Sequence, residues 1–378
     1  FRSVKNDGRF WVMETSTSHN GCLIDHQKPH RTGFLTAEAV AAYAAGGMGF
    51  NYWLWRQQKS GCEQPHGSLM SAWGKPTIGF NEVKKVEQAR KKISSVILST
   101  TVKQADVAIT YSAEARAFYR TEPYEGIDYL TEIEKIHEIV VGQGLSRDVV
   151  SDDNPIEGYK LLITPFLPHV KDQVLERALA LVEQGATWIV GPMTGMRTGE
   201  HTVPTDHALG KLEEAVGINV IYHFPISDTG ASMVYDGVEA ELCYFASVFE
   251  PNGVRVIAKT QGGVAPDLPV IVEVSRGKGT IVMIGAMPKG DAGKQLLGRL
   301  ISDYAVKAGA GNYYRADAGT IVYERCGDGE EYVIAINMDG KGGSISFSSD
   351  YRDLETGRTV NNTVGIGAYQ YKIFQKLV

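Results

Sequence analysis

The sequence predicts an α/β protein built in three consecutive parts. Residues 1–98 have the pattern of two βα units, residues 99–310 alternate short apolar strands with helices, and residues 311–378 contain hairpin-like strands. Alternating strands and helices are typical of a parallel sheet covered on both faces, whereas strands joined by short turns favour antiparallel sheets. A chain of 378 residues with 43% hydrophobic and 22% charged residues is long enough for two or three domains.

Two aromatic, apolar stretches in the first part are expected to form strands. Residues 10–15 contain Glu14 close to their end, and residues 49–55 are followed by a polar loop with Glu63 and His66. Because functional groups gather at the strand ends of parallel barrels, we expect Glu14 and Glu63 to open onto one pocket. The alternative is that both stretches are ordinary core strands and that Glu14 caps the following turn.

Two helices are expected beside these strands. Residues 36–45 are rich in alanine, begin with Thr36 at the N-cap position and end at Gly46. Residues 80–98 carry apolar residues at helical spacing among many lysines. Two strands cannot close a barrel, so this part is expected to leave its inner face bare.

The second part repeats the change from strand to helix. Strands are expected at residues 106–111, 160–164, 187–190 and 279–284. Helices are expected at residues 129–143, 171–184 and 292–308. Between them, residues 218–274 contain several β-like runs and are expected to form a strand-rich insertion or edge region of the same domain.

The third part is expected to be a small antiparallel β domain. Strands are expected at residues 320–324, 331–337, 344–347 and 369–374. The dipeptides Asp328-Gly329 and Asp339-Gly340 lie between strands, and such dipeptides are typical of tight hairpin turns.

The polar residues of the first part suit the cleavage of a sugar. A retaining glycosidase needs one ionised carboxylate as nucleophile and one carboxylic acid as proton donor, roughly 5–5.5 Å apart. Aromatic rings offer a surface to the C–H face of a sugar, and charged side chains orient its hydroxyl groups. Both kinds of side chain occur at the end of the second strand and in the residues that follow it, at Trp53, Trp55, Arg56, Glu63 and His66.

Together these segments resemble glycoside hydrolase family 42, the β-galactosidases. The stretch Val12-Met13-Glu14-Thr15 is similar to the nucleophile strand of that family, and Trp55-Arg56-Gln57, with the loop that follows, is similar to its last barrel strand. The resemblance implies that Glu14 is the nucleophile and that four other residues bind the sugar, namely Trp53, Arg56, Glu63 and His66. Many members carry Asn-Trp shortly after the nucleophile, where this chain has Ser18-His19-Asn20-Gly21.

The resemblance also implies a fold, a partner and an activity. Residues 1–98 would end a (β/α)8 barrel, and residues 99–310 would form an amidotransferase-like, flavodoxin-like α/β domain that makes a homotrimer. The activity implied is retaining hydrolysis of terminal, non-reducing β-D-galactosides in the cytoplasm. The acid/base Glu of the family lies on the fourth barrel strand, and no strand precedes Phe10, so we expect this chain to be an incomplete portion that is inactive alone.

Two other interpretations remain from different classes of protein. The chain as given is a non-catalytic oligomerisation and sugar-binding module, or it is an amidotransferase-like enzyme. Amidotransferases place a nucleophilic Cys on a tight turn after a strand, and the comparable turn at residues 191–195 has neither Cys nor Ser. The lack of a nucleophile on this turn disfavours the amidotransferase-like interpretation. Glu200 and His201 nearby are expected to be loop residues.

Composition argues against several other partners and against a metal. A net charge of -6 disfavours nucleic acid and anionic membranes, and no apolar run approaches the roughly 18 residues of a membrane span. His19, His26 and His30 are too loosely spaced to indicate a metal site, and no cofactor is expected. The cysteines are scattered without C-x-x-C spacing, at Cys22, Cys62, Cys243 and Cys326.

Overall fold

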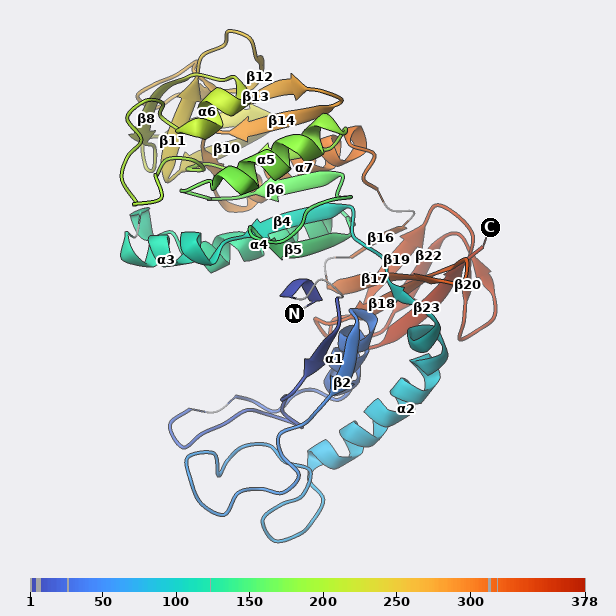
Figure 1. Cartoon of the computed structure of the whole chain (residues 1–378). Helices are drawn as coiled ribbons and strands as arrows, with labels where there is room; N and C mark the ends of the chain where they lie inside the picture. The colour runs from blue at the N-terminus through green and yellow to red at the C-terminus, as the bar shows by residue number, and fades with distance from the viewer. Residues whose placement is uncertain are drawn as a thin grey trace. The chain divides into compact units, whose positions relative to one another are not determined.

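The computed structural model describes residues 2–4, 8–25, 27–122, 124–311, 314–317 and 319–377. The chain forms two compact units, which are described separately below (Figure 1). Unit 1 comprises Phe1–Lys103 together with Tyr313–Val378, and unit 2 comprises Gln104–Asn312. The division into domains at residues 98 and 310 stays a prediction.

Unit 1 begins with the two parallel strands that the sequence predicts. β1 (Phe10–Val12) and β2 (Gly47–Phe50) pair in parallel, with α1 (Phe34–Ala44) between them in the chain. The long helix α2 (Ile78–Ser99) follows, as its helical periodicity indicates. A short 3-10 helix, Arg2–Val4, precedes β1.

The strands end earlier, and α1 begins earlier, than the sequence predicts. Beyond Val12 and Phe50 the regular strands end, but backbone hydrogen bonds still join the two segments, among them Thr15 N to Asn51 O, and an isolated bridge pairs Ser16 with Trp53. The predicted N-cap at Thr36 is wrong, because the helix starts after Gly33, whose φ is 93°.

A carboxylate from the second helix takes the place of the predicted cap. The amide of Gly33 donates to Glu82 Oε2 at 2.8 Å, and Glu82 lies on α2. A side chain distant in sequence therefore satisfies a donor at the N-terminus of α1, which local capping rules do not anticipate.

The C-terminal residues form two antiparallel sheets in unit 1. One sheet has the strand order β21-β20-β23-β18-β17-β3, and the other has the order β16-β19-β22. Their strands are β3 (Thr101–Val102), β16 (Tyr314–Ala316), β17 (Thr320–Gly327), β18 (Glu330–Asn337), β19 (Gly343–Phe347), β20 (Tyr351–Asp353), β21 (Thr359–Val360), β22 (Thr363–Ile366) and β23 (Tyr371–Lys376).

The predicted hairpin turn between β17 and β18 is confirmed. Asp328 and Gly329 both have positive φ, at 51° and 81°. Two positive φ values in a two-residue loop match the twist of antiparallel strands, which is why Asp-Gly is favoured there.

The larger C-terminal sheet packs on the two helices of unit 1. Val40 of α1, Ile93 of α2 and Ile334 of β18 belong to one apolar core, and each side chain is at most 1% exposed. A separate core joins β18 to the smaller sheet through residues that include Phe347 and Phe374. The helices thus have one face covered by residues that lie more than two hundred positions later in the chain.

Arg325 of β17 ties this sheet to the C-terminal ends of both helices. Its guanidinium donates to the carbonyl oxygens of Tyr43, Ala44, Ile97 and Thr100, the last at 2.6 Å, and to Thr100 Oγ1 at 2.9 Å. Burial lowers the pKa of Arg325 to about 10. A cation is favoured there because the last carbonyl groups of each helix point toward it without helical partners.

Unit 2 is built around a mixed sheet in the order β15-β10-β9-β12-β13-β14-β7-β6-β4-β5. Its strands are β4 (Val107–Tyr111), β5 (Arg147–Ser151), β6 (Leu161–Thr164), β7 (Thr187–Val190), β9 (Ser232–Tyr235), β10 (Val238–Cys243), β12 (Arg255–Gln261), β13 (Pro269–Arg276), β14 (Gly279–Ile284) and β15 (Met287–Pro288). β8 (Val220–Pro225) and β11 (Phe245–Phe249) form a separate antiparallel pair.

The predicted parallel sheet is present as half of this mixed sheet. The strands β14, β7, β6, β4 and β5 pair in parallel, and antiparallel strands continue the sheet from β13. Most of the antiparallel half comes from the segment expected to be strand-rich. Three of the parallel strands, β6, β7 and β14, are buried along their whole length, which agrees with their mainly apolar sequences.

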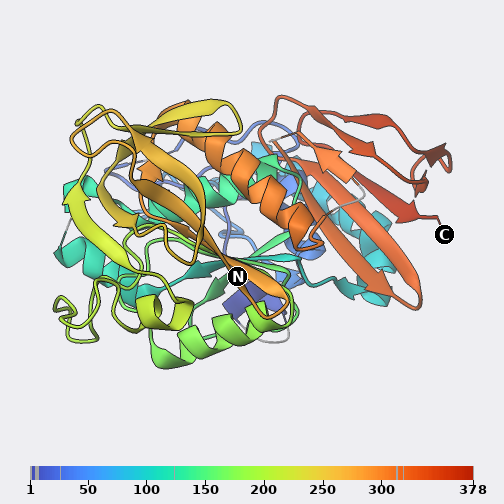
Figure 2. The ribbon, with the colours of Figure 1, turned by 90° about the horizontal axis from the view of Figure 1, so that it is seen from above.

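Helices cover both faces of the parallel half. They are α3 (Ala113–Thr121), α4 (Tyr129–Gly142), α5 (Asp172–Glu183), α6 (Lys211–Val216) and α7 (Gly290–Lys307), with a 3-10 turn at Tyr124–Gly126. α4 and α7 pack together, and α5 lies over the opposite face (Figure 2). This follows from right-handed crossovers that run in opposite directions along the sheet.

The strand order reverses between β4 and β6. β4 pairs with β5 on one side and with β6 on the other. The chain therefore runs from β4 to β5 in one direction along the sheet, and from β5 past β4 to β6 in the opposite direction. Ligands of open α/β sheets bind at the carboxyl ends of strands at such a reversal. Across the described ranges of both units, no helix combines the length and the apolar character required to cross a membrane.

Candidate active site

Glu14 follows β1 and has an exposed side chain. The backbone on either side of it is held by β2 and the residues after that strand, because Thr15 N donates to Asn51 O at 3.1 Å and Trp53 N donates to Thr15 O at 2.9 Å. Within the described ranges the Glu14 carboxylate forms no hydrogen bond or ion pair. A fixed backbone with an unengaged carboxylate is a geometry that suits a nucleophile.

Trp53 and Glu63, both predicted to bind the sugar, lie in contact. Trp53 Nε1 donates to Glu63 Oε2 at 3.1 Å, and Gln58 Nε2 donates to the same oxygen at 3.2 Å. Among the described residues, Glu63 Oε1 is therefore the oxygen left for another donor. The sequence pattern did not predict that Gln58 bonds to Glu63, because this contact depends on how the loop between them folds.

His66 is the most buried of the predicted site residues, with 7% of its surface exposed. Its Nδ1 lies 3.0 Å from the carbonyl oxygen of Gly67. A carbonyl oxygen only accepts hydrogen bonds, so Nδ1 carries the hydrogen in the neutral ring and Nε2 is the acceptor nitrogen. The backbone of His66 also bonds to Glu63, with N to O at 3.0 Å.

Arg56 is exposed and is fixed by the following loop. Its Nη2 donates to the carbonyl oxygen of Ala72 at 2.7 Å, and its backbone forms an isolated bridge with Met70. This bond occupies one of the five N–H donors of the guanidinium group, so the others remain for a sugar hydroxyl or water.

The loop after β1 and the loop after Trp53 are bonded to each other. His19 Nε2 lies 2.7 Å from the carbonyl oxygen of Pro65, and Gly67 N donates to His19 O at 2.9 Å. A Cβ atom on Gly67 would lie 2.3 Å from Ser18 Oγ, so only glycine permits this approach. His19 stands in the segment that departs from the family pattern, and here it joins the two loops.

Thr15 connects the strand end to a buried carboxyl group on α1. Its Oγ1 lies 3.3 Å from both oxygens of Glu38. Burial raises the pKa of Glu38, and the hydrogen bond from Thr15 opposes that rise. The hydroxyl of Tyr52 is buried nearby without a hydrogen-bond partner among the described residues, and burial followed by the charge of Glu38 raises its pKa.

Replacing Glu38 with Gln is expected to stabilise unit 1 at neutral pH. Because the folded-state pKa of Glu38 is raised from 4.5, its contribution to stability is complete below that value and is lost as pH rises through the raised pKa. Gln keeps an acceptor for Thr15 but carries no charge to desolvate. The melting temperature of the variant minus that of the parent should therefore increase from pH 4.5 to pH 8, and a constant difference would contradict the prediction.

Large apolar side chains are exposed around this site. Three of them are Trp11 at 62%, Trp55 at 66% and Trp73 at 75%, and Met13 beside Glu14 is 71% exposed. This exposure agrees with the expectation that the strands of the first part leave one face bare. Flat aromatic rings next to hydrogen-bonding groups can hold the C–H face of a sugar.

The histidines near the site offer no metal cluster in the described part of the chain. No group of three or more His, Cys, Asp or Glu residues is placed to hold an ion there. His30 stacks on Phe34 with ring centroids 4.5 Å apart, and burial lowers its pKa. His26, the third member of the predicted histidine group, lies outside the described residues.

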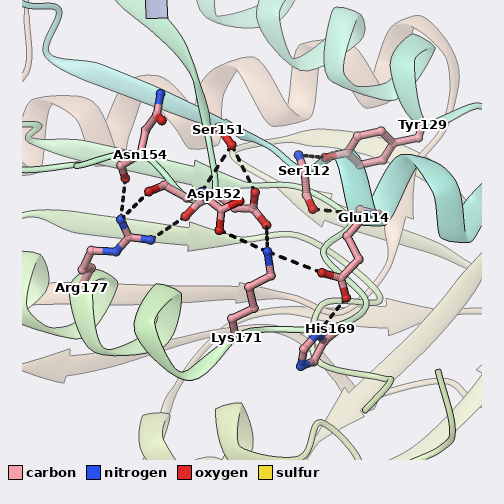
Figure 3. A network of polar contacts seen from close by, with 11 residues as sticks. Ser112, Glu114, Tyr129, Ser151, Asp152, Asn154, His169, Lys171 and Arg177 are labelled. Carbon is pink, nitrogen blue, oxygen red and sulfur yellow. Dashed lines mark hydrogen bonds and ion pairs between the residues drawn. The ribbon is translucent and has the colours of Figure 1, made fainter. Parts of the chain in front are cut away.

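Unit 2 has its own polar network at the carboxyl ends of β4, β5 and β6 (Figure 3). Glu114 Oε1 bonds to His169 Nδ1 at 2.9 Å, and Lys171 reaches Glu114 at 3.5 Å and Asp153 at 3.1 Å. Arg177 of α5 donates to three carbonyl groups in the loop after β5. The network fixes these loops where the strand order reverses.

A shallow hollow, open to solvent, lies beside this network. It is lined by Glu114, Ala115, Phe118, Pro168, His169, Arg197 and His201. None of these is a Ser, Thr or Cys. On the turn at residues 191–195 the hydroxyl of Thr194 is buried and accepts from Leu167 N at 3.2 Å. These contacts give no support to an amidotransferase activity.

Two family models match consecutive parts of the chain. Residues 1–93 match the β-galactosidase model of glycoside hydrolase family 42, and residues 105–307 match the model described as the β-galactosidase trimerisation domain. The second match alone covers more than half of the chain. The boundary between the matches falls close to the boundary between units 1 and 2.

Curated relatives are similar along the whole chain. β-Galactosidase YesZ of Bacillus licheniformis is 41% identical over 374 residues, which are 99% of this chain and 56% of the relative. β-Galactosidase YesZ of Bacillus subtilis is 39% identical over 99% of this chain and 57% of the relative. The chain thus spans about half the length of the curated relatives it matches.

Solved structures share the fold. The β-galactosidase from Bacillus circulans sp. alkalophilus superposes with a TM-score of 0.88 at 22% identity, covering 100% of this chain and 56% of that one. Gan42B, a family 42 β-galactosidase from G. stearothermophilus, gives 0.88 at 21% identity, covering 100% and 55%. On these matches, the chain belongs to the β-galactosidases of glycoside hydrolase family 42.

Proposed function

We propose that this chain is the nucleophile-bearing part of a retaining β-galactosidase that hydrolyses terminal, non-reducing β-D-galactosides. The observation that carries the proposal is the unengaged carboxylate of Glu14 beside Thr15, whose carbonyl oxygen accepts from the backbone of Trp53, while the Trp53 indole donates to Glu63. Family membership supports the same assignment. In this mechanism Glu14 attacks C1 of the galactose and forms a covalent glycosyl-enzyme, which water then hydrolyses.

The sugar is held by the four other predicted site residues. Glu63 accepts a hydroxyl proton at Oε1, His66 accepts one at Nε2, and Arg56 donates from its remaining N–H groups. Trp53 presents its ring to the sugar while its indole N–H keeps Glu63 in place. Hydrogen bonds from these residues orient C1 toward Glu14.

We infer that the general acid comes from residues outside this sequence. The resemblance places it on the fourth strand of a (β/α)8 barrel, of which β1 and β2 are here proposed to be the last two strands. Relatives that are nearly twice as long support this proposal. The isolated chain is then inactive, since a retaining site needs a second carboxyl group about 5–5.5 Å from the first.

Unit 2 is proposed to have an amidotransferase-like, flavodoxin-like fold and to assemble three copies of the chain. The match to a trimerisation domain over residues 105–307 supports this assembly. The rival function, a non-catalytic oligomerisation and sugar-binding module, rests on the same match. Galactosidase activity of the complete gene product, with none from a version that carries Glu14→Gln, excludes the rival.

A mechanism-based label tests the nucleophile directly. A 2-deoxy-2-fluoro-galactoside with an activated leaving group should trap the glycosyl-enzyme of the complete galactosidase on the peptide that contains Glu14. The fluorine slows breakdown of the covalent species by disfavouring its oxocarbenium-like transition state. Mass spectrometry locates the label, and a label on a different carboxylate contradicts the proposal.

Replacing Glu63 with Gln is expected to lower kcat/KM of the complete galactosidase by roughly 10–150-fold, since a hydrogen bond to a charged group is worth about 1.5–3 kcal/mol. Gln retains an acceptor for Trp53 but loses the charge that grips a hydroxyl. Steady-state kinetics measure the loss. Complete inactivation that added azide restores would instead make Glu63 a catalytic carboxylate.

A further inference from the structure

Cys22 and Cys62 lie on the two loops that frame the candidate active site. Leu23, which follows Cys22, donates its amide hydrogen to the carbonyl oxygen of Cys62, with N and O 2.7 Å apart. With standard peptide dimensions, a straight N–H···O bond of this length places the Cα atoms of the two cysteines within about 6 Å of each other. Disulfides join Cα atoms separated by about 4.4–6.8 Å.

Other contacts keep these loops in the same arrangement. His19 bonds to Pro65 and Gly67 on the far side of Cys62, so the loops are joined at three places. Cys22 itself lies in a turn in which its amide donates to Asp25 O at 2.7 Å. The approach of the two cysteines therefore belongs to a bonded pair of loops and does not depend on one contact.

Both residues are at least partly exposed to solvent, and the other two cysteines lie elsewhere in the chain. Cys62 is exposed, and Cys22 is partly exposed. Cys243 belongs to unit 2, where its Sγ donates to Met287 O at 3.4 Å. Cys326 lies on β17, and its cross-strand neighbours are Thr101 and Glu331.

We propose that Cys22 and Cys62 are a covalent modification site that forms a reversible disulfide by exchange with a small-molecule disulfide such as oxidised glutathione. The thiolate of the exposed Cys62 attacks one sulfur of glutathione disulfide, and one glutathione thiolate leaves. Cys22 then attacks the mixed disulfide and expels the second glutathione. Two cysteine S–H bonds are lost and one S–S bond forms, while the small disulfide is reduced to two thiols that take up the two protons.

The bond would fix the loop that carries Glu63. Glu63 is the next residue after Cys62, and its carboxylate accepts from Trp53 and Gln58. A disulfide between Cys22 and Cys62 would link the loop after β1 covalently to the loop that carries Glu63. The two loops could then no longer move apart. The effect on sugar binding rests on the proposed function, whereas formation of the disulfide does not.

The test uses the 378-residue chain without substitutions. After incubation with oxidised glutathione, free thiols are blocked with N-ethylmaleimide and the protein is digested with trypsin without reduction. We expect the tryptic peptides 10–31 and 60–84 to be joined, with Cys243 and Cys326 carrying the blocking group. Free thiols should fall by two per chain, and dithiothreitol should restore them.

Matched variants separate this outcome from others. Cys22→Ser should leave Cys62 as a mixed disulfide with glutathione and abolish the joined peptides, whereas Cys326→Ser should leave them unchanged. A native protein that gives only glutathione adducts, a bridge between two chains, or a bridge that forms equally fast in 8 M urea overturns the proposal. The measurement needs no galactosidase activity, so it stands apart from any failure of the proposed function.

Discussion

Glu14→Gln is expected to lower kcat of the complete β-galactosidase by roughly 10⁴–10⁶-fold, the loss typical of removing a catalytic nucleophile. The amide is nearly the same size as the carboxylate but cannot form the covalent bond to C1. The Glu14 side chain is exposed and makes no hydrogen bond or ion pair with other described residues, so the substitution should leave the melting temperature nearly unchanged. Steady-state kinetics and thermal unfolding together separate loss of chemistry from loss of fold.

A control and a rescue sharpen this experiment. Glu87→Gln changes an exposed carboxylate on α2 that pairs with Arg90, far from any proposed role, and it should keep full activity. External azide should restore part of the activity of a smaller variant, Glu14→Ala, by attacking C1 from the vacated space and giving galactosyl azide of inverted configuration. Activity of Glu14→Gln within tenfold of the parent would show that a different residue is the nucleophile.

Arg325→Met is expected to destabilise unit 1 by about 3–5 kcal/mol, the cost of leaving several carbonyl groups at the helix ends without their hydrogen-bond donor. Methionine carries no charge, so folding of the variant no longer has to desolvate a guanidinium group. This favourable change in free energy offsets part of the destabilisation. The carbonyl groups at the ends of α1 and α2 nevertheless remain in the core after losing their donors, at about 1–3 kcal/mol for each unsatisfied group. Several such groups outweigh the single gain, so the net effect is a loss.

The measurement is chemical denaturation of the parent chain and the variant. The midpoint of the transition that includes unit 1 should shift to lower denaturant. Arg352→Met supplies the control, because Arg352 is exposed on β20 of the same sheet and its replacement should change stability little. Arg325→Lys should fall between the two, since an ammonium keeps the charge but cannot reach four carbonyl groups at once. Equal effects of Arg325→Met and Arg352→Met would contradict the assignment.

Most elements of the fold could be predicted because their signals are local. β7 and β14 occur at the predicted residues, and α2 and α5 agree with prediction to within two residues. Unbroken apolar runs and helical spacing are visible within a few residues of chain. The elements that were not predicted are short or amphipathic segments with weak patterns, and they include α3, β5 and α6.

The candidate site was predictable as a set of residues but not as a set of contacts. Glu14, Trp53, Arg56, Glu63 and His66 could be selected because strand ends and a family pattern mark them. Their roles stay predictions, since neither the fold nor the family match tests them. Which oxygen of Glu63 is occupied, and by which donors, depends on atoms brought together by loop folding.

The sequence by itself determined the class of most long segments, most of the parallel strands, the Asp328-Gly329 turn and the family, because propensity and pattern act over short stretches of chain. Only the tertiary structure decided that Glu82 caps α1, that Arg325 holds two helix ends and that Cys22 approaches Cys62. These contacts join residues between 40 and more than 200 positions apart. Their energies come from donors and acceptors that meet after the chain is packed, and no local pattern encodes such meetings.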